Sequence, residues 1–131
     1  MIRKFEEIIK MRLEIEKLKQ STIAEIRSMG APPSQVKDVM MATFLLLGES
    51  QKTVSKWDNI RSLLGKTGKM GARRRILELD LASLDGKYQT LKQAKQLCKE
   101  QTLADVQEVS VGAAVFFAWC LVTIDTLETT W

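Results

Sequence analysis

The spacing of apolar residues along the chain is helical from one end to the other. A seven-residue repeat runs through residues 2–29 and predicts one long helix with a coiled-coil seam. The seam positions are Ile8, Met11, Ile15, Leu18, Thr22 and Met29. A second apolar stripe on another part of this helix is formed by Ile2, Phe5, Ile9 and Leu13. The pairing register is therefore weakly specified, and an amphipathic helix of a bundle fits the pattern as well as a coiled coil does.

Five further helices are predicted, and no segment alternates in the way of a strand. Their expected ranges are about 33–47, 54–64, 71–79, 84–99 and 103–127. The predicted fold class is all-α, with about six helices that form a small helical bundle at the tip of an antiparallel coiled-coil hairpin. The returning helix stops at Trp131 soon after it leaves the bundle, so we expect the chain to be a segment of a longer protein.

The last predicted helix contains an uncharged run, VSVGAAVFFAWCLVTI, at residues 109–124. At about 1.5 Å per residue the run covers only about 24 Å, which is less than the roughly 30 Å of a bilayer core. A membrane span is therefore disfavoured, and a buried core helix is expected instead. The expected inward side chains are Val115, Phe116, Trp119 and Val122 or Thr123.

The composition argues against an enzyme, a cofactor site and a metal site. The chain has no histidine, which removes the commonest general base and metal ligand. Its two cysteines, Cys98 and Cys120, have neither metal-site nor redox-motif spacing, and reduced thiols in a cytosolic or nuclear compartment are expected. The segment GKTGKMG at residues 65–71 lacks the spacing of a phosphate-binding loop.

The chain carries a mild positive bias, and basic residues cluster in its middle. The net charge is +4, and five basic residues gather within ten positions: Lys66, Lys69, Arg73, Arg74 and Arg75. Such a cluster is either a solvated face or a contact surface for an acidic partner, such as nucleic acid, anionic lipid or an acidic protein. No aromatic residues are interleaved with it, which disfavours nucleic acid.

Three segments resemble the stalk tip of dynein heavy chains, which is their microtubule-binding domain. The most specific is AEIRSMGAPPSQVKDVMMATFLLLGES at residues 24–50. The others are Trp57 followed by IRSLL at residues 60–64, and VQEVSVGAAVFFAWCLVTID at residues 106–125, so the resemblance spans nearly the whole chain.

The resemblance implies a non-catalytic head, residues 19–124, that binds the acidic surface of the tubulin dimer in a microtubule. Residues 1–18 then correspond to the first coiled-coil strand of the stalk, and residues 125–131 to the start of the returning strand. In this family the first, third and last head helices form the contact surface, and the stalk couples track affinity to a distant ATP-driven motor ring. The implied location is the cytoplasm and cytoskeleton, or the axoneme of a cilium or flagellum.

Individual positions agree only in part with the family pattern. Lys19, Arg27 and Lys66 fall on basic contact positions, and Lys69 and Arg73 complete the candidate binding set. In contrast, Glu108 and Ala118 occupy places that are usually basic, and Gln20 replaces a lysine. We therefore expect weaker microtubule binding than in a cytoplasmic transport dynein, or a shifted footprint. The alternative is a degenerate stalk head that acts as a structural or protein-interaction module. No nucleic acid or membrane partner is expected.

Overall fold

The structure, a computed structural model, describes residues 2–130 of the chain and the side chains of residues 6–128. Its helices are α1 (Ile2–Glu16), α2 (Gln20–Arg27), α3 (Ser34–Leu46), α4 (Gln51–Val54), α5 (Trp57–Leu64), α6 (Ala72–Leu77), α7 (Tyr88–Lys99), α8 (Leu103–Val109) and α9 (Val111–Thr130), with short 3₁₀ turns η1 (Gly68–Met70) and η2 (Leu81–Leu84). The described residues contain no strand, which confirms the all-α prediction.

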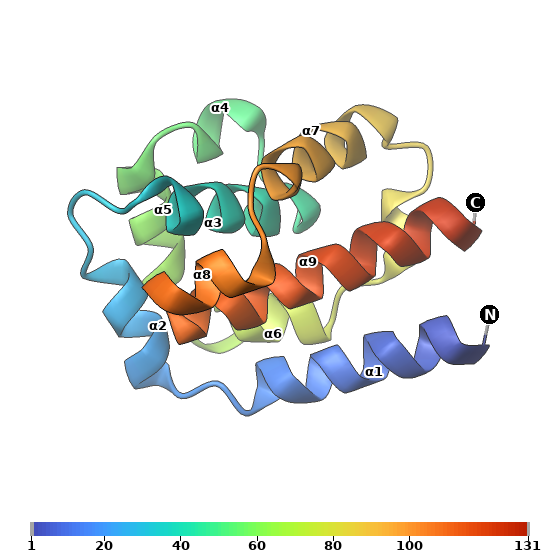
Figure 1. The fold of residues 1–131 in the computed structure, drawn as a ribbon, viewed down its shortest axis with the longest axis horizontal. Coiled ribbons are helices and arrows are strands. Elements are labelled where there is room, and N and C mark those ends of the chain that lie inside the picture. Colours follow the sequence, from blue (N-terminus) through green and yellow to red (C-terminus); the bar gives the residue numbers. More distant parts are fainter. Residues whose placement is uncertain (1, 131) are drawn as a thin grey trace.

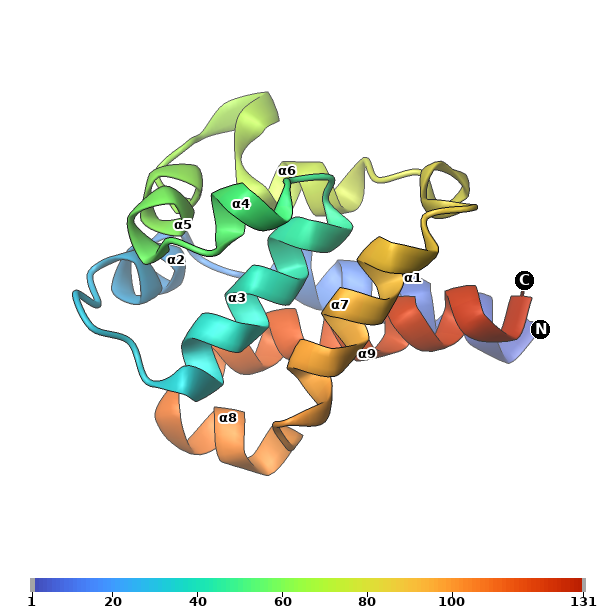
Figure 2. The ribbon, with the colours of Figure 1, turned by 90° about the horizontal axis from the view of Figure 1, so that it is seen from above.

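Helix α9 is the central element of the bundle. Helix α1 runs antiparallel along it, so that both chain ends lie at the same end of the molecule (Figure 1). Helices α3 and α7 pack on the opposite side of α9 from α1 (Figure 2). The largest fully buried side chains include Phe44 of α3 and Phe116, Phe117 and Trp119 of α9. The predicted small helical bundle is therefore observed, and within it α1 and α9 form an antiparallel pair.

The long helix predicted over residues 2–29 is two helices, and this prediction was wrong. Helix α1 ends at Glu16, and α2 begins after Lys19, whose backbone is extended. Neither proline nor glycine causes the break. The carbonyl of Leu18, which a continuous helix would use internally, instead accepts a hydrogen bond from the Arg73 guanidinium of α6. A tertiary contact therefore stabilises the break between α1 and α2, for which the local sequence gives no signal.

The last predicted helix, 103–127, is likewise divided, at Ser110. The Ser110 backbone is extended, and its hydroxyl oxygen accepts a hydrogen bond from the Ala113 amide at 3.0 Å. This is the geometry of a serine that caps the start of a helix, so Ser110 ends α8 and begins α9. The helix predicted over residues 54–64 begins later than expected, because Val54 is the last residue of α4 and α5 begins at Trp57.

The two apolar stripes of α1 have different environments. Ile8 and Ile15 of the heptad seam are buried, whereas Ile9 and Leu13 of the second stripe are 57% and 50% exposed. The side chains of Ile2 and Phe5 lie outside the described part of the chain, as do Met1 and Trp131, the outer ends of the two expected stalk strands. In the described residues, the heptad seam is thus the stripe that packs in the core.

The uncharged run forms most of α9, as expected for a core helix. By length and apolar composition alone, Val111–Glu128 also meets the requirement for a membrane span, but 61% of this window is buried within the bundle. Phe116, Trp119 and Thr123 face inward as predicted, while Val115 and Val122 are only partly buried.

Candidate functional site

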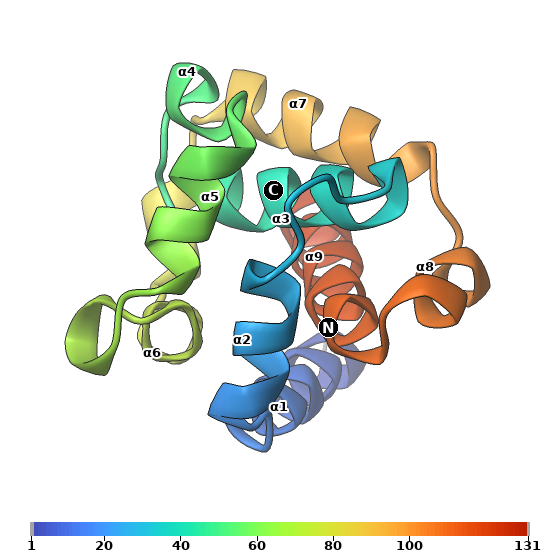
Figure 3. The same cartoon turned by 90° about the vertical axis from the view of Figure 1, so that its left-hand side faces the viewer.

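Helix α2 lies between α5 and the first turns of α9, at the end of the molecule away from the chain ends (Figure 3). Two reciprocal hydrogen bonds fix it to α5: the Arg27 Nε donates to the Arg61 carbonyl at 3.2 Å, and the Arg61 Nε donates to the Arg27 carbonyl at 2.9 Å. The Trp57 indole N–H donates to the Met29 carbonyl at 2.6 Å. The face made by α5, α2, α8 and the start of α9 is called here the end face.

Close packing of α2 side chains against the backbone of Gly112 sets the distance between α2 and α9. A Cβ atom placed on Gly112 of α9 would lie 2.5 Å from the Thr22 Cγ2 and 3.4 Å from the Ile26 Cδ1 of α2. Only glycine fits this position without movement of a neighbour. Gly112 therefore determines how closely α2 lies against the central helix α9.

A hollow of about 600 Å³ separates α2 from α8 and is called the α2–α8 hollow. Its charged lining residues are Lys17, Lys19, Glu14, Glu25 and Glu108. Lys19 and Glu108, which were assigned to the contact surface from separate parts of the sequence, thus line the same hollow. Three carboxylates outnumber two ammonium groups there, so this part of the end face is close to neutral and slightly acidic.

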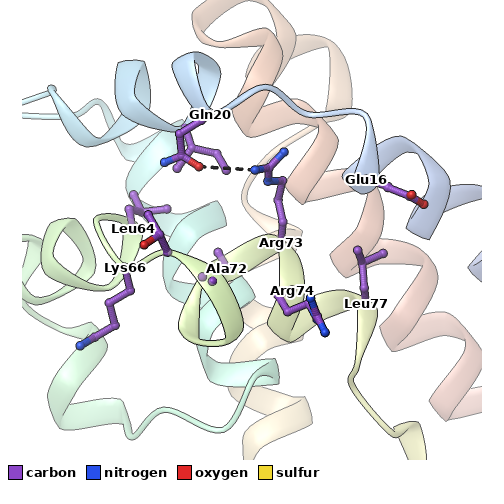
Figure 4. A pocket seen from close by; sticks show the side chains of 12 residues that line it. Glu16, Gln20, Leu64, Lys66, Ala72, Arg73, Arg74 and Leu77 are labelled. Atoms are coloured by element: carbon purple, nitrogen blue, oxygen red, sulfur yellow. Dashed lines mark hydrogen bonds between the residues drawn. The ribbon is translucent and has the colours of Figure 1, made fainter.

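A second hollow, of about 310 Å³, lies between α2, the end of α5 and α6, and is called the α6 hollow. Lys66 and Arg74 line it together with the backbone of Gly68 and Gly71, while Glu16 lies at its far side (Figure 4). The η1 turn places Lys69 on the adjoining surface, and both Lys69 and Lys66 are exposed. The basic character predicted for residues 66–75 is therefore greatest here.

The arginines of the basic cluster differ from its lysines in their partners. Arg73 donates to the Leu18 carbonyl and, at 3.5 Å, to the Gln20 side-chain oxygen. Arg75, not a member of the predicted site, pairs with Glu49 at 2.9 Å, and Arg74 pairs with Glu78. The guanidinium groups of Arg73 and Arg75 connect elements of the head, whereas the Arg74 pair is local to α6. Lys66, Lys69 and Arg74 are the exposed members of the cluster.

The five predicted site residues lie in three places around α2 and its junctions. Lys19 lines the α2–α8 hollow, Arg27 lies over the C-terminal turn of α5, and Lys66, Lys69 and Arg73 surround η1 and α6. Ala118 of α9 is half-buried.

Two residues that organise the end face were missed by sequence reasoning. Arg61 holds Arg27 through the paired bonds, and a lone arginine gives no sequence signal for that role. Gly112 had a usable signal, since a glycine within an apolar helical run often marks a close backbone approach.

Two thiols are among the buried groups of the bundle. Cys98 and Cys120 are both free and buried, and burial raises the pKa of the Cys120 thiol well above its usual range. The neighbouring Cys98 raises that pKa further, and the thiol lies 3.2 Å from the Thr43 hydroxyl. Among the described residues, no three His, Cys, Asp or Glu side chains are grouped as metal ligands.

No family model matches the chain. An all-α bundle with this mixed-charge end face does not by itself define a family, but two curated proteins are similar to it in sequence. The chain is 26% identical over 110 residues to the cytoplasmic dynein 2 heavy chain 1 of Chlamydomonas reinhardtii. It is 27% identical over 112 residues to the cytoplasmic dynein 2 heavy chain 1 of Caenorhabditis elegans. Each match covers 82% of this chain and about 2% of the relative's length. The similarity supports an origin in a dynein heavy chain and, at that level, a dynein-related role.

Proposed function

We propose that the chain is the non-catalytic microtubule-binding head of a dynein heavy chain. The observation that carries this proposal is the end face, where α2, α5 and the start of α9 lie side by side and present basic residues. These are the first, third and last head helices that the resemblance assigned to the track contact. The similarity to two dynein heavy chains over 82% of the chain supports the same proposal.

In this proposal, residues 19–124 form the head, residues 1–18 the first stalk strand and residues 125–131 the start of the returning strand. The rest of the stalk and an ATP-driven motor ring are the intramolecular partners. The acidic tubulin surface is the external partner, in the cytoplasm or in an axoneme. Catalysis belongs to the ring, and the head changes only its affinity for the track.

We assign the direct tubulin contacts first to Lys19, Lys66 and Lys69, because their side chains are exposed at the end face or on the adjoining η1 surface. Arg27 contributes at the edge of α5, where its guanidinium also supports the C-terminal turn of that helix. Arg73 has a partly structural role, since its bonds hold the α1–α2 junction. An exposed charge pair contributes roughly 0.2–1 kcal/mol, so several lysines are needed for measurable binding.

Glu108 weakens the same surface. Its carboxylate lines the α2–α8 hollow with Glu14 and Glu25 and opposes the attraction of Lys19 for an acidic partner. This local charge balance also favours the second candidate function, a degenerate stalk head that acts as a structural or protein-interaction module. Replacing Glu108 separates the two, because Glu108→Lys should strengthen track binding only if the end face contacts the track.

Co-sedimentation with microtubules across a salt series tests the proposal. We expect saturable pelleting that weakens as salt rises, since exposed charge contacts are screened over about 8 Å at physiological ionic strength. Lys66→Glu and Lys19→Glu should each weaken binding about 2- to 30-fold at low salt, which corresponds to roughly 0.5–2 kcal/mol for a reversed surface contact. The matched control is Lys92→Glu on α7, outside the end face, which should leave pelleting unchanged.

Absence of pelleting by the parent chain at low salt would exclude a microtubule-binding head and leave the interaction module. Pelleting that Lys66→Glu, Lys19→Glu and Glu108→Lys all leave unchanged would show that the end face is not the contact surface. Circular dichroism of each variant establishes that the helical fold is retained.

A further inference from the structure

A second surface lies at the opposite end of the molecule from the end face. Helix α7 and the C-terminal half of α9 leave two hollows between them, of about 430 and 270 Å³, near the end where both chain ends lie (Figure 1). Both hollows are lined by Lys95 of α7 and Glu128 of α9, whose charged atoms are 2.8 Å apart. The two hollows are therefore parts of one groove, the α7–α9 groove, with this ion pair between them.

The lining of the α7–α9 groove is mostly apolar. Leu91 and Leu127 line the larger hollow, and Leu121 and Ile124 line the smaller one. Tyr88, at the first turn of α7, lines the larger hollow and is 75% exposed. Together with Leu121, which is 40% exposed, it leaves an apolar surface uncovered at both ends of the groove.

The two rims of the groove carry opposite charge. Lys92, Lys95 and Lys99 follow one another at spacings of three and four residues on α7, so they form one basic row. Asp125 and Glu128 of α9 line the other side. A partner that fits this pattern carries acidic groups along the edge that meets α7 and basic groups along the edge that meets α9.

The spacing of the two hollows matches the repeat of a helix. Leu91 lines the larger hollow and Cys98 the smaller, and these residues are seven positions apart on α7. Seven residues correspond to about 10.5 Å along a helix axis, which is also the distance between side chains at positions i and i+7 of a docked helix. Two apolar anchors of one amphipathic helix therefore reach both hollows at once.

We propose that the α7–α9 groove is a docking site for an amphipathic helix of a separate protein. The docked helix places apolar side chains at i and i+7 in the two hollows and acidic side chains against Lys92 and Lys99. An acidic residue at i+3 or i+4 lies opposite the Lys95–Glu128 pair and competes with Glu128 for Lys95. This site is separate from the proposed track contact, so the head can hold such a partner whether or not it is bound to the track.

The test uses a designed 14-residue stapled helix as the probe, with leucine at two positions seven apart and glutamate along one edge. Its binding to the ¹⁵N-labelled 131-residue chain is followed by amide chemical shifts. We expect saturable shifts confined to α7 and the C-terminal half of α9. A probe with lysine in place of each glutamate should bind at least about tenfold more weakly, since several attractive contacts become repulsive.

Variants of the chain complete the test. Lys92→Glu combined with Lys99→Glu should weaken the glutamate probe about tenfold or more, whereas Lys66→Glu on the end face should leave its affinity within about twofold. Absent shifts, shifts centred elsewhere, or equal binding of both probes would overturn the proposal. So would a concentration-dependent dimer in sedimentation equilibrium that the double variant abolishes, because a second copy would then cover the groove. Microtubule pelleting is measured separately, so failure of either proposal leaves the other distinguishable.

Discussion

Replacing Gly112 by alanine tests the idea that a single missing side chain sets the position of α2. The new Cβ would stand 2.5 Å from the Thr22 Cγ2, whereas carbon atoms in contact prefer about 3.5–4.0 Å. Thr22 is β-branched, so its methyl group cannot rotate away without a new rotamer. Relief therefore requires Thr22 to change rotamer, α2 to move away from α9, or the start of α9 to shift.

The expected cost follows from two opposing effects. Overpacking of this kind costs about 1–3 kcal/mol. Alanine is favoured over glycine within a helix by up to about 1 kcal/mol, and Gly112 is in the first turn of α9, where that gain is smaller. We therefore expect Gly112→Ala to lower the free energy of unfolding by about 1–2 kcal/mol. For a chain of this size, that corresponds to a fall in Tm of about 4 °C for each kcal/mol.

Thermal and urea unfolding followed by circular dichroism give the measurement. The matched control is Gly30→Ala, because nothing lies within 4 Å of a Cβ at Gly30 and its φ is not in the left-handed region. That control should be neutral or slightly stabilising, since alanine reduces the freedom of the unfolded chain. The difference between the two variants isolates the clash.

Thr22→Ser, which removes the Cγ2 methyl group, completes a double-mutant cycle. If the reasoning is right, Gly112→Ala loses most of its cost in the Thr22→Ser background, and the two changes couple favourably. An equal cost in both backgrounds would refute the assignment of the clash to Thr22. Parent-like stability of Gly112→Ala alone would refute the idea that the α2–α9 approach requires glycine.

Three further predictions concern single side chains of the head. Trp57→Phe removes the donor to the Met29 carbonyl and should lower the free energy of unfolding in urea by about 1 kcal/mol or more. Burial raises the pKa of Asp38, so its charge disfavours the folded state at neutral pH; Asp38→Asn should be more stable than the parent at pH 7, and this advantage should vanish as pH falls below about 3.9. Cys98 and Cys120 should resist a thiol reagent at pH 8 in the native chain and react fully in denaturant, and rapid native labelling would contradict their burial.

The sequence was sufficient for helix positions wherever the signals were local. The third helix begins after Pro33 and its end is followed by Gly48, whose φ of 103° is in the region that glycine tolerates best. These helix start and stop signals depend only on neighbouring residues in the chain, so they can be recognised without a structure. The Ser110 cap belongs to the same class, and the apolar run that follows it obscured the signal.

Other features depend on residues far apart in the chain and have no local signal. The break near Leu18 depends on a bond from Arg73, fifty-five positions later. The difference between exposed Lys66 and Lys69 and the engaged Arg73 and Arg75 depends on which carbonyls and carboxylates the fold brings near. Charge and spacing identified residues 66–75 as a candidate surface, but only the packing of α6 separates Lys66 from Arg73 in role.

The contacts between α1 and α6 have a mechanical consequence. Arg12 of α1 donates to the Leu79 carbonyl just after α6, at 2.9 Å, and Arg73 of α6 donates to the Leu18 carbonyl just after α1. These two hydrogen bonds, one near each end of α6, oppose sliding of α1 along α6. We therefore expect a force applied along α1 to reach α6 through these two hydrogen bonds, before it reaches α2 across the interrupted backbone at Leu18.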